Sequence, residues 1–101
     1  MINLYDYQQP PSGDETFTEL FKNEKVVISS IASNTLEEGG WYEQEEDEWL
    51  VLLEGEALLS VDDETLSLKR GDTLFIPAFQ LHRVIKTSSD ALWLTVHVNP
   101  N

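Results

Sequence analysis

The sequence predicts a single all-β domain, an antiparallel sandwich or barrel, with one short helix near the N-terminus. Short apolar and β-branched segments recur at regular spacing through the 101 residues. Compact turns rich in Gly, Asp and Ser separate these segments, as in small antiparallel folds. The run Trp49–Leu53 is continuously apolar, which is typical of a strand that is covered on both faces. No internal repeat divides the chain, so one domain is expected.

Residues 1–25 are expected to form an N-terminal arm that carries the helix. The arm begins with a polar segment that ends in Pro-Pro-Ser-Gly at residues 10–13, a turn sequence. Ser12 and Glu15 then have the spacing of a capping box. The apolar residues that follow share one helical face: Phe17, Leu20 and Phe21. This pattern predicts a helix over residues 14–22.

Residues 26–101 are expected to form the barrel. The first strand is predicted at Val26–Ile31, and a loop at residues 36–48 follows, with seven acids in its last twelve positions. The remaining segments with apolar runs or apolar–polar alternation are predicted as strands: 49–53, 57–61, 65–68, 73–76, 81–87 and 92–98.

Composition excludes several classes of partner and chemistry. The net charge is −13, from nineteen acids against six Lys and Arg, and phosphate binding needs clustered cations. We therefore expect neither nucleic acid nor an anionic membrane as a partner. The chain has no cysteine, which excludes disulfides, thiolate nucleophiles and Cys-ligated zinc. No segment approaches the ~20 apolar residues of a membrane span, and residues 1–6 lack a signal-peptide pattern, so a cytoplasmic location is expected.

A barrel of this size leaves apolar strand faces in need of cover. If Glu48 and alternate residues of the following strand face inward, then Trp49, Val51 and Leu53 face outward. We therefore expect a symmetric homodimer that packs strand faces rich in Trp and Leu.

Two stretches carry the candidate chemistry. In the first, Glu48 opens the apolar run and is followed seven residues later by Gly55. In the second, Gly71 opens a short strand that Pro77 ends, and His82 follows five residues later. A carboxylate and an imidazole at strand ends can converge within one barrel, and together they suit a divalent transition metal.

These stretches resemble the two motifs of the cupin superfamily. In the second motif Gly71, Pro77 and His82 fall on the pattern, whereas Phe79 stands at its second glycine and Lys86 at its asparagine. The resemblance covers roughly residues 36–86. It implies a cupin-like antiparallel β-barrel, that is, a jelly roll.

The first cupin motif is matched in part. Glu48 and Gly55 fall on it, while Leu36 stands at its opening glycine. The positions of its two histidines fall on Tyr42 and Gln44, or on Trp41 and Glu43 under the longer spacing.

The resemblance implies a site made of Glu48 and His82 as metal ligands, Gln44 as a third ligand, and Tyr42 as an acid/base or substrate-orienting group. An N/O site without thiolate suits zinc, nickel, manganese or iron. The alternative is that Tyr42 and Gln44 are only the polar mouth of the barrel, because both are weaker ligands than imidazole.

The role of His97 depends on which face of the last predicted strand, residues 92–98, points into the barrel. Trp93, Thr95 and His97 share one face, and Leu92, Leu94, Val96 and Val98 share the other. His97 becomes a further metal ligand if the first face lines the cavity, and an exterior residue if the second does.

Two functions remain open from the sequence. The chain is either a metal-dependent cupin enzyme of the dioxygenase, isomerase or lyase kind, or a non-enzymatic module that binds a small molecule and has lost its metal. Both predict a small-molecule ligand at the barrel mouth, whose identity no motif specifies.

Overall fold

The computed structural model describes residues 1–100, which form eight β-strands and no helix. The strands, in chain order, are β1 Glu15–Lys22, β2 Val26–Ser33, β3 Asp47–Glu54, β4 Glu56–Val61, β5 Glu64–Lys69, β6 Thr73–Ile76, β7 His82–Thr87 and β8 Ala91–Val98. Accordingly, no helix in the described part of the chain has the length and apolar character to span a membrane.

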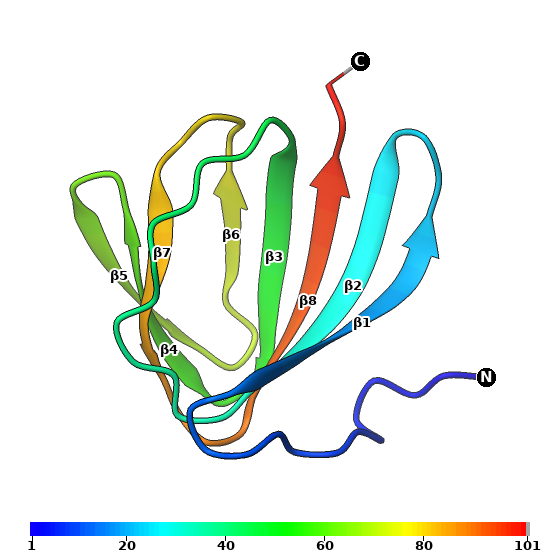
Figure 1. Cartoon of the computed structure of the whole chain (residues 1–101), viewed down its shortest axis with the longest axis vertical. Helices are drawn as coiled ribbons and strands as arrows, with labels where there is room; N and C mark the ends of the chain where they lie inside the picture. Colours follow the sequence, from blue (N-terminus) through cyan, green and yellow to red (C-terminus); the bar gives the residue numbers. More distant parts are fainter. Residues whose placement is uncertain (101) are drawn as a thin grey trace.

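The strands form two antiparallel sheets that face each other (Figure 1). The larger sheet has the order β1-β2-β8-β3-β6, and the smaller has the order β5-β4-β7. The sheets meet near the bottom of the view in Figure 1 and diverge toward the top. The all-β antiparallel architecture predicted from the sequence is confirmed.

The helix expected over residues 14–22 is wrong, because these residues form strand β1 at the edge of the larger sheet. Phe17 lies opposite Ile31, but a β-bulge after Glu19 places Phe21 opposite Ile28. Since Ile28 and Ile31 lie on opposite faces of β2, the bulge sends the two phenylalanines to opposite faces of the sheet. The spacing that resembles a helical face is therefore a strand pattern interrupted by one extra residue.

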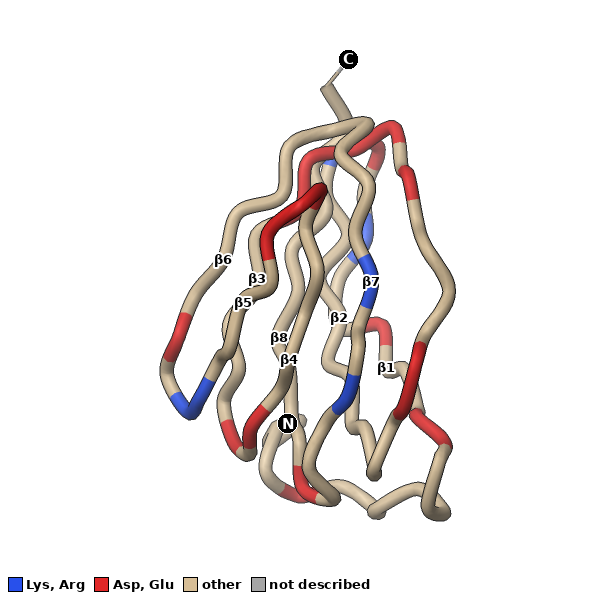
Figure 2. Tube along the Cα trace, turned by 90° about the vertical axis from the view of Figure 1, so that its left-hand side faces the viewer, with Lys and Arg blue, Asp and Glu red and all other residues tan. Residues whose placement is uncertain are grey.

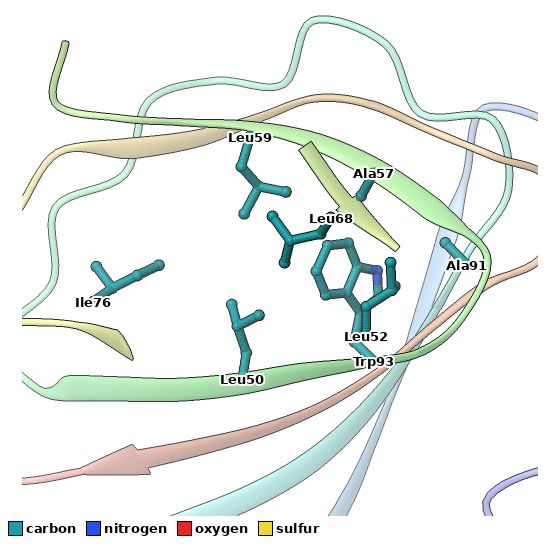
Figure 3. Packing of buried hydrophobic residues seen from close by; sticks show 8 residues of the cluster. All are labelled: Leu50, Leu52, Ala57, Leu59, Leu68, Ile76, Ala91 and Trp93. Atoms are coloured by element: carbon teal, nitrogen blue, oxygen red, sulfur yellow. The ribbon is translucent and has the colours of Figure 1, made fainter. Parts of the chain in front are cut away.

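The core lies between the two sheets (Figure 3). Leu50, Leu52 and Trp93 of the larger sheet pack against residues of the smaller sheet. The facing residues are Ala57, Leu59 and Leu68. Burial of each large apolar side chain contributes about 1.5–3 kcal/mol, so this layer holds the sheets together. The inward alternation from Glu48 to Leu52 places the candidate carboxylate on the same face as the core.

Gly55 makes the close bend between β3 and β4 possible. Its φ is 87°, in the left-handed region that favours glycine. A Cβ at this position would lie 2.8 Å from Cα of Ala91 and 2.6 Å from Oγ of Ser88. The glycine of the first motif is thus required by the approach of the β8 backbone.

An apolar row crosses the outer face of the larger sheet. Its members are paired across neighbouring strands in the order Phe75, Trp49, Val96, Ile28 and Phe21. Phe75 and Phe21 are about half exposed, at 54% and 51%, and Trp49 is 39% exposed. A contiguous apolar row on a sheet face is a feature of protein–protein contacts.

We propose that this row is the contact face of the homodimer expected from the sequence. The wild-type chain should be a dimer at micromolar concentration in light scattering, and Phe75→Glu should shift it to a monomer because a charge would be buried in the contact. Phe79→Ser, at an exposed loop phenylalanine, is the matched control and should stay dimeric. A monomeric wild type would contradict the proposal.

Candidate functional site

Three strands and one loop bring the candidate residues together at one end of the barrel. Glu48 lies on β3 directly opposite His97 of β8, so the two side chains share the inner face of the larger sheet. His82 is the first residue of β7, in the smaller sheet, and Gln44 precedes β3 in the loop. The structure therefore brings all four predicted ligand residues together.

The carboxylate of Glu48 is the centre of this cluster. It is 8% exposed, and its Oε1 lies 3.4 Å from Nε2 of His97 and 3.8 Å from Nε2 of His82. The side-chain amide of Gln44 donates a hydrogen bond to the same oxygen at 3.1 Å. A buried carboxylate needs such partners, because its desolvation would otherwise be costly.

His82 is held by the backbone on both sides. It exchanges two backbone hydrogen bonds with Tyr42, of 2.8 and 3.0 Å, which tie the loop to the start of β7. Its Nδ1 lies 3.0 Å from the carbonyl oxygen of Gln80. Because a carbonyl only accepts, Nδ1 carries the proton, and Nε2 is the ring atom directed at Glu48.

His97 lies on the cavity face of β8. Trp93 and Thr95, on the same face, are buried at 5% and 2% exposure. Val96, on the opposite face, belongs to the outer apolar row. Of the two orientations that the sequence left open, the structure has the one that places His97 inside.

The pKa values of the central pair shift in opposite directions. Burial alone would raise the pKa of Glu48, but the hydrogen bond and charge of His97, with Gln44 and His82, outweigh burial and lower the pKa below 4.5. The hydrogen bond to Glu48 raises the pKa of His97 above 6.5, against the opposing effect of its own burial. Both shifts favour the charged pair.

The cluster forms one end of a cavity of about 220 Å³ between the sheets. Tyr42, Gln44, Glu48, His82 and His97 all line it. The rest of the wall is mainly apolar, and the lining also includes Glu15 and Ser33. A larger, open groove of about 450 Å³ lies beside Glu56, Leu58 and Lys86, away from this chemistry.

Glu15 and Ser33 were not predicted as site residues. Glu15 was missed because a helix over residues 14–22 gives it no fixed relation to the barrel interior, and Ser33 was missed because it lies beyond the end of the strand predicted at Val26–Ile31. The alternation of Glu15, Phe17 and Glu19 along β1 was the signal in the sequence that could have placed Glu15 inward.

Tyr42 lies at the open side of the cluster. Its ring centroid is 6.2 Å from that of His82, the rings are tilted by 33°, and the side chain is 63% exposed. Trp41, the alternative motif position, instead stacks on the guanidinium of Arg83 at 4.8 Å. The structure therefore favours the register that places Tyr42 and Gln44 at the motif positions.

The cluster is arranged as a hydrogen-bonded ion pair. Within residues 1–100, no group of three or more His, Cys, Asp or Glu side chains has an arrangement that could hold a metal ion. The donor types nevertheless fit one, because two imidazole nitrogens and a carboxylate form a known N/O ligand set, to which Gln44 would add an oxygen only by turning the amide that now donates to Glu48.

The β6–β7 loop supports the site through a strained residue. Phe79, at the position of a motif glycine, has a φ of 66°, and its N–H donates to the carbonyl of Gln44 at 2.7 Å. A side chain in this left-handed region costs about 1–2 kcal/mol.

This strain predicts a difference between two truncations of Phe79. Both Phe79→Gly and Phe79→Ala remove the exposed ring, but only glycine relieves the backbone strain. Phe79→Gly should therefore be more stable than Phe79→Ala by about 1 kcal/mol in urea unfolding. An alanine variant at least as stable as the glycine variant would contradict this.

The Glu48–His97 pair predicts a pH-dependent stability. His97 contributes to the free energy of unfolding in full below pH 6.5, and this contribution is lost as the pH rises through the pKa of His97 in the folded protein. Glu48 contributes in full above pH 4.5, and its contribution is lost as the pH falls through the pKa of Glu48 in the folded protein. His97→Gln should therefore lower the free energy of unfolding most between pH 4.5 and 6.5, by about 1 kcal/mol in urea unfolding, and by less at pH 9. Lys25→Gln serves as the control for general pH effects. An equal cost of His97→Gln at pH 5.5 and 9 would refute the assignment.

Comparisons with known proteins agree with this architecture. A family model described as a cupin domain matches residues 31–97. None of the curated proteins matches the chain. Among solved structures, a protein from Ralstonia eutropha JMP134 named "putative mannose-6-phosphate isomerase" is similar, with 30% identity and a TM-score of 0.89. The similarity covers 98% of this chain and 97% of that chain.

Two further structures are similar over nearly the whole chain. The protein TT1209 from Thermus thermophilus has 25% identity and a TM-score of 0.76, covering 98% of this chain and 96% of that one. KdgF from Halomonas sp. has 15% identity and a TM-score of 0.82, covering 99% and 92%, and it shares the fold alone. Since the cupin domain match spans more than half of the sequence and agrees with the observed fold, the chain belongs to the cupin family.

Proposed function

We propose that this cupin binds a divalent transition metal through Glu48, His82 and His97, with Gln44 alongside, and binds a small molecule in the adjoining cavity. The observation that carries the proposal is that both histidines direct Nε2 at the same carboxylate oxygen, at 3.4 and 3.8 Å. Two imidazoles and one carboxylate are a ligand set used for zinc, nickel, manganese and iron.

The tautomer of His82 supports this assignment. With its proton on Nδ1, facing the Gln80 carbonyl, His82 directs the Nε2 lone pair toward Glu48. In the neutral ring this nitrogen offers a lone pair, and a cation between it and the carboxylate would be favourable for both groups. A hydrogen bond from the second ring nitrogen to a backbone carbonyl is also the usual support of a metal-bound histidine.

Metal binding would replace the ion pair that the structure shows. The proton that His97 shares with Glu48 would leave, because imidazolium cannot act as a ligand. Small movements of the His97 and Glu48 side chains would open the ion position. A bound metal of this kind supplies Lewis-acid polarisation of a ligand oxygen.

Tyr42 is proposed as the group that orients the small molecule or exchanges a proton with it. It lines the cavity beside His82 and remains accessible from the open side. The Ralstonia protein is named as a putative isomerase, which supports the isomerase alternative for this chain.

The cytoplasmic location and the absence of nucleic-acid binding stay predictions. Figure 2 shows many acidic residues along the loops and few Lys or Arg residues, as expected for a protein that does not bind nucleic acid.

A metal-free binding module is the second candidate. The observation that favours it is that Glu48 is already satisfied by His97 and Gln44 without any metal. In that case the charged pair would bind the polar group of the ligand directly.

Metal binding by single variants distinguishes the two. In calorimetry with Zn²⁺ at pH 8, Glu48→Gln, His82→Ala and His97→Ala should each weaken binding about 100-fold or more, because each removes one ligand. Glu45→Gln, which removes an exposed carboxylate of the same loop, is the matched control and should bind as the wild type does. If the wild type takes up no Zn²⁺, Ni²⁺, Mn²⁺ or Fe²⁺, the metal site is refuted and the metal-free module remains as the candidate.

A further inference from the structure

A second polar group lies at the far end of the same cavity. Glu15 is paired with Ser33, and His97 with Val27, which is six residues away along β2. The indole N–H of Trp93 donates to Oγ of Ser33 at 3.2 Å, and the Ser33 hydroxyl donates to Oε2 of Glu15 at 3.3 Å. Because an indole nitrogen can only donate, the Ser33 hydrogen is committed to the carboxylate.

Glu15 keeps unused acceptor capacity. The hydrogen bond from Ser33 is the one that the described residues provide, and a carboxylate can accept several. Partial burial of the carboxyl group raises the pKa of Glu15 despite this bond, although the residue as a whole is exposed because β1 is an edge strand. A carboxylate in this position is stabilised by any hydrogen-bond donor brought into the cavity.

The wall between the two ends of the cavity is mainly apolar, with Arg83 and Thr95 as further polar members. The apolar side chains that line it include Phe17, Ile31, Leu50, Leu59, Val84 and Trp93. Its volume of about 220 Å³ has room for a small organic molecule, and we choose chains of about six and about eight carbon atoms to probe it.

We propose that Glu15 is a specificity residue that accepts a hydrogen bond from a terminal hydroxyl group of the ligand. The ligand is then a slender molecule with an oxygen head group at the Glu48 end, an apolar middle and a hydroxyl at the Glu15 end. This inference rests on the proposed function only in taking the cavity as the ligand site.

The same geometry disfavours a second anionic group beside Glu15, although the cation Arg83 also lines the cavity. A carboxylate or phosphate at the far end would face Glu15, and the two negative charges would repel each other. It would also bring no hydrogen for the unused carboxylate oxygen. The site therefore discriminates by repulsion as well as by attraction.

Three matched probes test this inference: 6-hydroxyhexanoate, hexanoate and adipate, together with their eight-carbon equivalents. Binding to the full chain is measured by calorimetry, and the indole N–H resonance of Trp93, assigned with Trp93→Phe, reports on the far end. The wild type should bind the hydroxy acid of the fitting length at least about fivefold more tightly than the plain acid, and about tenfold more tightly than the diacid. The Trp93 resonance should shift with the hydroxy acid.

Glu15→Gln should reduce both preferences to about twofold or less, whereas Glu19→Gln, on the same strand but outside the cavity lining, should keep them. Equal binding of hydroxy acid and diacid by the wild type, unchanged preferences in Glu15→Gln, or no binding of any probe would each overturn the inference.

Zn²⁺ titration of the same variants separates this inference from the proposed function. Glu15→Gln should bind Zn²⁺ as the wild type does, because Glu15 lies at the other end of the cavity. A Glu15-dependent preference without Zn²⁺ binding would leave the inference standing and remove the metal. Zn²⁺ binding by a protein that shows no Glu15-dependent preference for the hydroxy acid would support the metal site and overturn the inference about Glu15.

Discussion

The pairing of the buried Glu48 carboxylate with two imidazoles is the interaction on which the site depends. Glu48 is 8% exposed, so the fold is stable only if its charge is compensated. The partners come from distant parts of the chain: His82 begins β7, and His97 lies near the end of β8. The position of one carboxylate thus ties together the ends of three strands from two sheets.

The loop before β3 is fixed by the same requirement. Gln44 contacts Glu48 through its side chain, and its carbonyl accepts a hydrogen bond from Phe79. Asp47 accepts a second bond from the β6–β7 loop, from the N–H of Ala78 at 2.8 Å. The strained backbone at Phe79 persists because these contacts over-determine it, as occurs at sites where geometry matters more than local stability.

Periodicity and motif spacing predicted the barrel from the sequence. The alternation from Glu48 through Leu52, the bend at Gly55 and the convergence of His82 on Glu48 all appear in the structure. These features depend on local rules: strand period, glycine at a positive φ, and fixed spacing between strand ends.

Features that depend on which strands pair in the folded protein were not predicted from the sequence. The segment 14–22 has a helix-like spacing of apolar residues because of the bulge after Glu19. It forms a strand because it pairs with β2. The inward face of His97 depends on which apolar face of β8 the smaller sheet covers, which the alternation leaves open. The alternation of Glu15 and Phe17 marks one face of a strand, but only the pairing of β1 with β2 determines that this face lines the cavity.

The ring nitrogens of His82 and His97 offer the most direct test of the central claim. Long-range ¹H–¹⁵N spectra at pH 8 report which nitrogen of each ring carries the proton. We expect His82 to carry the proton on Nδ1, and we expect Zn²⁺ to shift the Nε2 signals of both histidines together. A proton on Nε2 of His82, with neither Nε2 signal responding to Zn²⁺, would contradict the claim.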